Sequence, residues 1–148
     1  MTGASSPTPR AVFIGRLSRD YFILPDGKVV LDVPGGNLIY AAVGQLIWDP
    51  EPPPGLVARA GEDFPLDWML EFQRRGLDTR GIKILPEPLD LRSFYIYSNR
   101  STRLKEDPVA HFARLGLPFP KALLGYRVDN STLDSRTKLL PISLRQSD

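Results

Sequence analysis

The chain has 148 residues, 42% of them hydrophobic, with 19 lysines and arginines against 17 aspartates and glutamates. This length and composition are typical of one globular domain with a real core, and the scattered, nearly balanced charge argues against nucleic acid as a partner. The absence of cysteine excludes disulfides, a thiolate nucleophile and cysteine-bearing zinc sites. No apolar run approaches the roughly 18 residues of a membrane span and the N-terminus has no leader. We therefore expect a cytoplasmic protein with no membrane partner.

Residues 1–10 have the composition of a disordered tail. The apolar run AVFIG, residues 11–15, predicts a strand buried on both faces. Two β-rich runs around Pro-Asp-Gly predict a β-hairpin over residues 21–33. Further strands are predicted by apolar or aromatic runs at residues 56–61, 81–85 and 92–98.

Two helices are predicted between these strands. The apolar run 38–48 follows Asn37, which we expect to be its N-cap, and the proline-rich segment after it cannot continue a helix. Asp63 is expected to cap a second helix over residues 64–75. The order strand, hairpin, helix, strand, helix, strand predicts an α/β fold with a parallel core.

The single histidine, His111, lies in the stretch DPVAHFARLG next to apolar residues. This pattern favours a histidine packed on a short helix over a catalytic base. A Ser-His-Asp site would also need a nucleophile on a strained turn such as G-x-S-x-G, which the sequence lacks. Hydrolase chemistry of this kind is therefore not expected.

Gly35, Gly36 and Asn37 directly precede the first predicted helix. Glycine lets a backbone approach a ligand closely, and amides at a helix N-terminus bind oxygens or anions, so these residues could cradle a polar substrate. A Gly-Gly turn that only joins a hairpin to a helix is the alternative, and the residues alone leave both open. The twelve glycines form neither a G-x-G-x-x-G fingerprint nor a P-loop.

The order of these motifs resembles the N-terminal half of the ribokinase-like, or PfkB, carbohydrate kinases. The resemblance covers about residues 11–98 and rests on the first strand, Asp20 five residues after it, PGGN opening an apolar helix with Ala41 and Ala42 behind, and the strand-GEDF-helix-GLDT block of residues 56–79. It implies part of a three-layer α/β sandwich, its N-terminal half, with a small β-lid that closes over a sugar or nucleoside.

The resemblance also implies a substrate site. Asp20 would accept hydrogen bonds from substrate hydroxyls, which suits the several lone pairs of a carboxylate, and Gly35, Gly36 and Asn37 would line the same pocket. Tyr40 stands where the family commonly has a second asparagine. Four aromatic residues of the lid are interpreted as packing residues: Tyr21, Phe22, Phe94 and Tyr95.

The family places ATP, the anion hole and the catalytic base in a C-terminal half marked by a G-A-G-D segment, which this chain does not contain. The resemblance thus implies ATP and Mg²⁺ for the complete enzyme, with no catalytic, cofactor-binding or metal residue in this chain. Residues 99–148 are interpreted as an irregular continuation toward that missing half. Because only two convincing helices are available for three or four strands, we expect an exposed sheet face or edge, and marginal stability or association with it.

We therefore expect the substrate-binding and lid half of an ATP-dependent kinase that transfers phosphate to a hydroxyl of a sugar or nucleoside. The alternative is a short, non-catalytic module of the same fold that binds or dimerises, because lid strands in this family can pair between subunits to form a homodimer. An unrelated small α/β domain is the third interpretation. The sequence leaves open whether this chain alone is an enzyme.

Overall fold

The computed structural model describes residues 8–128 of the chain. The chain divides into two compact units, Met1–Glu106 and Asp107–Asp148. The first unit contains two β-sheets and two helices, and the second contains one α-helix and one short 3-10 helix among the described residues. The strands and helices of the first unit alternate as an α/β fold requires, so the predicted fold class is confirmed.

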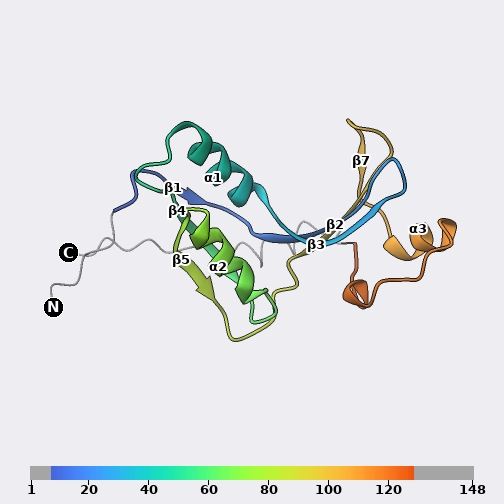
Figure 1. Ribbon diagram of the computed structural model, residues 1–148. Helices are drawn as coiled ribbons and strands as arrows, with labels where there is room; N and C mark the ends of the chain where they lie inside the picture. The colour runs from blue at the N-terminus through green and yellow to red at the C-terminus, as the bar shows by residue number, and fades with distance from the viewer. Residues whose placement is uncertain (1–7, 129–148) are drawn as a thin grey trace. The chain divides into compact units, whose positions relative to one another are not determined.

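The first sheet is parallel, with the strand order β1-β4-β5. Its strands are β1 (Val12–Ile14), β4 (Gly55–Ala60) and β5 (Asp78–Ile84). Helix α1 (Asn37–Trp48) precedes β4, and helix α2 (Leu66–Arg74) connects β4 to β5 (Figure 1). The parallel core expected from the alternation of strands and helices is therefore present.

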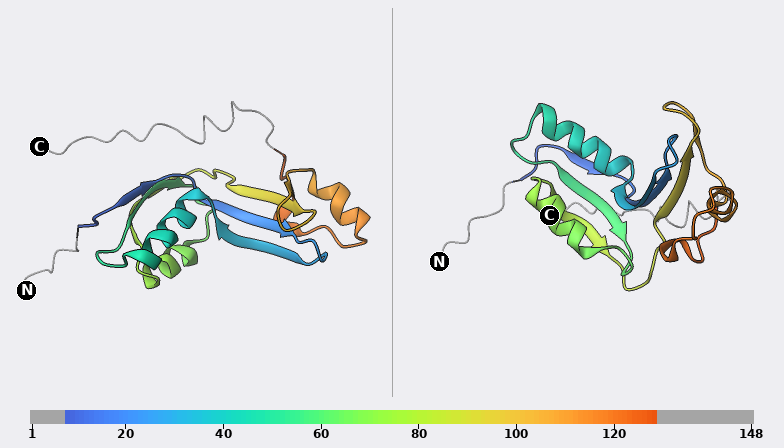
Figure 2. Two further views of the ribbon diagram at one scale, coloured as in Figure 1. Left: turned by 90° about the horizontal axis from the view of Figure 1, so that it is seen from above. Right: turned by 45° about the vertical axis from the view of Figure 1, so that its right-hand side comes forward.

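The second sheet contains the strands predicted to form the lid, is called the lid below, and has the strand order β3-β2-β6-β7. Its strands are β2 (Ser18–Ile23), β3 (Val29–Gly35), β6 (Arg92–Tyr97) and β7 (Arg103–Leu104). Strands β2 and β3 form the predicted antiparallel hairpin, while β2 and β6 are parallel. Strand β2 follows β1 closely in the chain and leads out of the first sheet, as the view from above shows (Figure 2). The lid is thus covalently continuous with the edge of the first sheet.

Both helices pack on one face of the first sheet (Figure 2). Alternate residues of a strand point to the same face, and in β4 these are Leu56, Ala58 and Ala60, all buried. Together they form one core with residues of the helices and adjoining loops: Leu17, Leu38, Ile39, Ala42, Phe64, Phe72, Leu77 and Leu91. This core fixes the start of α1 against the sheet.

The opposite face of the first sheet is uncovered by any helix among the described residues of its unit. Val12 and Ile14 of β1 are 52% and 55% exposed, so the prediction that this strand is buried on both faces was wrong. The reason is that α1 and α2 both pack on the other face. The expectation of an exposed sheet face is confirmed, whereas marginal stability and association stay predictions.

Both predicted N-caps were also wrong. Helix α1 begins at Asn37, and its N-cap is Gly36, which makes no side-chain capping bond. Helix α2 begins at Leu66 with Pro65 as its N-cap, again without such a bond. The Asp63 carboxylate instead accepts hydrogen bonds from the amides of Leu89 and Asp90, at 3.0 and 3.2 Å, because the chain that returns to the lid passes beside it.

The second unit contains helix α3 (Pro108–Arg114) and the 3-10 helix η1 (Lys121–Leu123). The Asp107 carboxylate accepts a hydrogen bond from the Val109 amide at 2.8 Å and caps α3. His111 is 7% exposed on this helix, so its interpretation as a packed histidine is confirmed. These elements and β7 lie within residues 99–128, while the predicted tail up to residue 7 and residues 129–148 lie outside the described residues.

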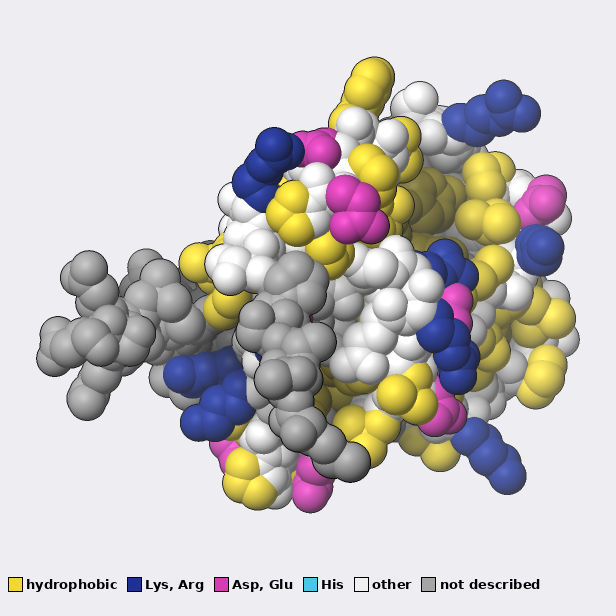
Figure 3. All heavy atoms as spheres, turned by 60° about the vertical axis from the view of Figure 1, so that its left-hand side comes forward, with side chains coloured by type: hydrophobic (Ala, Val, Ile, Leu, Met, Phe, Trp, Pro, Cys, Tyr) yellow, Lys and Arg dark blue, Asp and Glu magenta, His cyan; other side chains and the backbone are white. Residues whose placement is uncertain are grey.

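The surface mixes hydrophobic and charged side chains. On the face shown in Figure 3, lysine and arginine side chains lie among aspartate, glutamate and hydrophobic ones rather than forming a separate field. Within residues 8–128, no helix has both the length and the apolar character needed to cross a membrane.

Replacing Leu56 by alanine should destabilise the first unit by about 2–5 kcal/mol, because a side chain that is 1% exposed would leave a cavity beneath both helices. The matched control is Leu66→Ala, at a leucine that is 63% exposed, which should change the unfolding free energy by less than about 0.5 kcal/mol. Urea unfolding of the two variants and the parent checks this. Equal losses would mean that the core is not where this fold places it.

Candidate functional site

Asp20 lies in the middle of β2 and is 5% exposed. Its Oδ1 accepts a hydrogen bond of 2.6 Å from the hydroxyl of Ser18, which points to the same face because it lies two residues away on the strand. Burial raises the pKa of Asp20 above its ordinary value, opposed by the Ser18 hydrogen bond and by the charges of Arg16 and Arg103. The result is a buried carboxyl group oriented by one neighbour.

Gly35 allows the β3 backbone to pass directly beside this carboxylate. It pairs with Ser18 across the hairpin, and a Cβ atom at this position would collide with the Asp20 carboxylate. Gly36 has a φ of +100°, and a Cβ there would collide with the Arg16 carbonyl group. Glycine is therefore required at both positions because a larger residue would collide with its neighbours. At Gly36 it is also required by the left-handed backbone.

Asn37 is the first residue of α1, and its Oδ1 accepts a hydrogen bond from the Arg16 amide at 3.1 Å. This bond joins the loop between β1 and β2 to the start of the helix. Asp20, Gly35, Gly36 and Asn37, the four residues predicted from the sequence, therefore occupy adjoining positions where β2, β3 and α1 meet. That they bind a substrate stays a prediction.

Three further polar residues near Asp20 were missed by the sequence analysis. Ser18 bonds Asp20 directly, and Ser93, 5% exposed, is its register partner on β6. Arg16 contributes positive charge to Asp20, and its Nε is buried without a hydrogen-bond partner in the described part of the chain. Ser18 could have been found from its i, i+2 spacing to Asp20 on one strand. Ser93 could not, because no local sequence pattern indicates the register between β2 and β6.

The lid aromatics fall on two different faces of the sheet. Tyr21 and Phe94 are fully buried on the face opposite Asp20, and burial raises the pKa of Tyr21 to about 12, which agrees with packing. Phe22 and Tyr95 are register partners on the Asp20 face and are only half-buried. Their rings stack with centroids 6.3 Å apart.

An ion pair on the opposite face holds the lid hairpin to the first sheet's loops. Arg19 donates from Nε and Nη2 to the two carboxylate oxygens of Asp32, at 2.8 and 2.7 Å, and from Nη1 to the Asp63 carbonyl group at 3.0 Å. The Arg19 hydrogen bonds lower the pKa of Asp32 below its ordinary value. The half-buried pair spans the irregular part of the hairpin next to Asp20.

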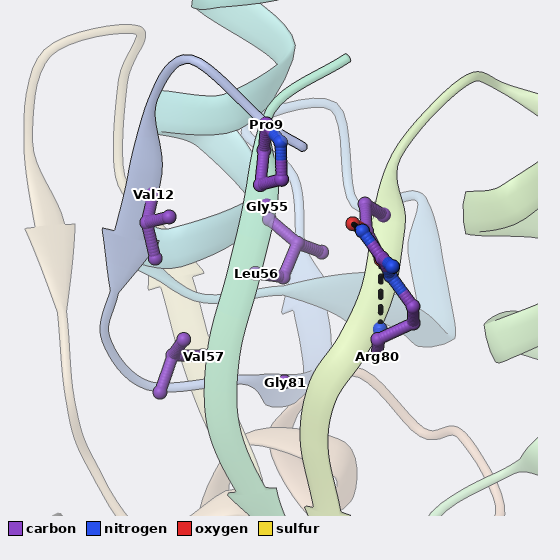
Figure 4. Close-up of a pocket in the computed structure, with 8 residues that line it drawn as sticks. Pro9, Val12, Gly55, Leu56, Val57, Arg80 and Gly81 are labelled. Atoms are coloured by element: carbon purple, nitrogen blue, oxygen red, sulfur yellow. Dashed lines mark hydrogen bonds and ion pairs between the residues drawn. The ribbon is translucent and has the colours of Figure 1, made fainter. Parts of the chain in front are cut away.

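A hollow of about 310 Å³ lies on the uncovered face of the first sheet, away from Asp20. Figure 4 shows the residues that line it: Pro9, Val12, Gly55, Leu56, Val57, Asp78, Arg80 and Gly81. Its two charged side chains, Asp78 and Arg80, pair with each other at 2.6 Å. The residues predicted to bind substrate are absent from its lining, so we do not place the site there.

Among residues 8–128, no group of three or more histidine, aspartate or glutamate side chains could hold a metal ion. The Asp20 carboxylate occupies the space beside Gly35, just before α1. Its negative charge opposes the binding of a phosphate there. The prediction for these residues is therefore still contact with a substrate rather than with nucleotide phosphates.

Comparison with known proteins points to the same family. A 75-residue segment is 39% identical to a cytidine kinase of Thermococcus kodakarensis, and it spans 51% of this chain and 26% of that protein. The structure matches an uncharacterized sugar kinase of Pyrococcus horikoshii with a TM-score of 0.50 and 25% identity, over 66% of this chain and 35% of that one. A comparison with profiles of known protein families gave no match.

These similarities confirm the resemblance to ribokinase-like carbohydrate kinases that the sequence motifs predicted. The fold is α/β and corresponds to part of a sugar kinase. The match spans about a quarter of the length of the curated relative, 26%.

Gly35→Ala should destabilise the chain by about 1–3 kcal/mol, because the new methyl group must displace the Asp20 carboxylate. Gly44→Ala is the matched control: a Cβ there meets no atom within 4 Å and the position is helical, so this change should stabilise the chain by up to about 1 kcal/mol. Denaturant unfolding of both variants checks the sign of each effect. A neutral Gly35→Ala would show that β3 does not lie against Asp20.

Ser18→Ala should raise the pKa of Asp20 further, because it removes a hydrogen bond that favours the charged form. The folded pKa already exceeds the unfolded one, so the carboxyl group contributes stability below the unfolded pKa and loses it as the pH rises through the folded pKa. An NMR titration of the Asp20 carboxyl carbon measures the pKa, and denaturant unfolding at several pH values measures the change in stability. Ser98→Ala, at an exposed serine after β6, should leave the titration unchanged, and an unmoved Asp20 in Ser18→Ala would contradict the assignment.

Proposed function

We propose that this chain is the substrate-binding and lid part of an ATP-dependent carbohydrate kinase, which transfers phosphate to a hydroxyl of a sugar or nucleoside. The observation that carries the proposal is the buried Asp20 carboxylate, oriented by Ser18 and bordered by the Gly35 backbone at the start of α1. Its support is the similarity to a cytidine kinase and to a sugar kinase.

The arrangement suits recognition of hydroxyl groups. One oxygen of Asp20 is bonded to Ser18, and the carboxylate retains lone pairs for hydroxyl donors on a substrate. Burial strengthens such hydrogen bonds because fewer water molecules compete for the carboxylate. Ser93 adds a hydroxyl group beside Asp20 that can donate or accept. A polyol would thus be held by several directional bonds at the base of the lid.

The proposed role of these residues is to position the substrate. ATP supplies the phosphoryl group and Mg²⁺ neutralises its charge during transfer, and we expect the complete protein to bind both through residues other than those described. Holding the accepting hydroxyl in place is itself a large part of catalysis in phosphoryl transfer. The proposal also places the protein in the cytoplasm, where ATP is available.

A second candidate function is a non-catalytic module that associates through an exposed surface. The observation in its favour is the uncovered face of the first sheet, with Val12 and Ile14 more than half exposed. Apolar strands left without a covering layer favour association with another surface. Sedimentation analysis of the chain would show a dimer under this alternative, and no ADP would form in the presence of ATP and any substrate.

Asp20→Asn should weaken substrate binding about 10- to 100-fold, because it replaces a charged acceptor by a neutral amide of the same size. The control is Asp26→Asn in the exposed hairpin turn, where the oxygen that accepts from the Lys28 amide is retained. Calorimetric titration of the protein with cytidine and ribose, together with ADP release from ATP in the presence of Mg²⁺, checks both. Equal binding by the parent and Asp20→Asn would overturn the site.

A further inference from the structure

An aromatic surface shares the lid face with Asp20. Along β2 the next residue on that face is Phe22, and its partner on β6 is Tyr95, in the same register that pairs Asp20 with Ser93. The Phe22 ring also meets Tyr97, edge to face, with centroids 5.9 Å apart. The polar end of the face therefore leads directly into a cluster of rings.

These rings are not part of the lid's packed side. Phe22, Tyr95 and Tyr97 are half-buried, whereas Tyr21 and Phe94 on the opposite face are fully buried. The hydrophobic core of the first sheet includes none of the three. Half-buried rings beside a polar group are available for a ligand that has both a polar and a planar part.

Tyr40 adds a fourth ring from helix α1. It lies one turn after Gly36 and is 63% exposed, and partial burial raises the pKa of its phenol, with the nearby groups of Asp20, Tyr97 and Tyr95 acting in the same direction. Tyrosine combines a flat apolar ring with a hydroxyl that can bond the polar edge of a heterocycle. Its place between the helix start and the lid strands suits contact with a ligand held at Asp20.

Arg103 of β7 gives the same surface a cation. Its guanidinium carbon lies 4.5 Å from the centre of the Tyr95 ring. Guanidinium groups stack on aromatic side chains and on nucleobases alike. The surface thus offers both kinds of group on which bases stack.

The spacing of residues along β2 and β6 separates the polar side chains on this face from the aromatic rings. Two residues along a strand span about 6.6 Å, so the rings of Phe22 and Tyr95 begin roughly that far from the Asp20 and Ser93 side chains. A free monosaccharide held by its hydroxyls at Asp20 would leave most of the ring cluster uncovered. A sugar with a planar substituent would cover it.

We propose that the aromatic face, defined as Phe22, Tyr40, Tyr95 and Tyr97, stacks against the base of a nucleoside whose ribose hydroxyls bind Asp20, so that the site takes nucleosides in preference to free sugars. This inference rests on the proposed function, because it requires Asp20 to bind the sugar hydroxyls. Base stacking on aromatic rings is worth enough to change affinity by about tenfold or more for each ring removed.

The test compares cytidine with ribose by calorimetric titration of the full chain, its Tyr95→Leu and Phe22→Leu variants, and Asp20→Asn. The parent should bind cytidine at least about tenfold more tightly than ribose, and each ring variant should reduce this ratio about tenfold. Asp20→Asn should weaken both ligands. The control Trp48→Leu, at a tryptophan that is 88% exposed at the end of α1, should change neither.

The outcomes separate the two proposals. If Tyr95→Leu and Phe22→Leu leave the ratio of cytidine to ribose affinity unchanged while Asp20→Asn weakens both ligands, the aromatic inference is overturned and the proposed function stands. If Asp20→Asn changes neither affinity, or if the parent binds neither ligand, both are overturned. If the ring variants change only the sedimentation coefficient of the chain, the aromatic face is an interface between copies and the inference fails.

Discussion

The close approach of the β3 backbone to the Asp20 carboxylate is the constraint on which the rest of the site depends. Any side chain at Gly35 would occupy the space of that carboxylate, and the left-handed backbone of Gly36 then turns the chain into α1. The hairpin, the carboxylate and the helix start are therefore brought together by two residues without side chains.

Strand β2 connects this site to the other strands of the lid. It pairs with β3 on one side and β6 on the other, so its alternation places Asp20, Ser93 and the half-buried rings on one face and the packed rings on the other. The bidentate Arg19–Asp32 pair holds the hairpin from behind, and the third bond of Arg19 reaches the Asp63 carbonyl group before α2. A half-buried, bidentate pair of this kind fixes orientation as well as adding energy.

The two faces of the first sheet are covered unequally, because both helices lie on one of them. The core between them and the sheet is continuous and closes around Leu56, whereas the other face presents Val12 and Ile14 to solvent. Parallel sheets are normally covered on both faces. The uncovered face and the lid are therefore two separate surfaces of the chain, and the residues predicted to bind substrate do not line the hollow on the uncovered face.

The sequence by itself determined the order of strands and helices, the hairpin, the residues predicted at the site and the resemblance to carbohydrate kinases, since each depends on local patterns of apolar residues, glycine and turn signals. It misplaced the caps at Asn37 and Asp63 because their carbonyl and carboxylate oxygens accept hydrogen bonds from chain segments that are distant in sequence. Only the tertiary structure decided which aromatics face Asp20 and that Ser93 lies beside it. The physical reason is that strand register and the choice of covered face follow from pairing between β2 and β6, which are separated by about half of the chain.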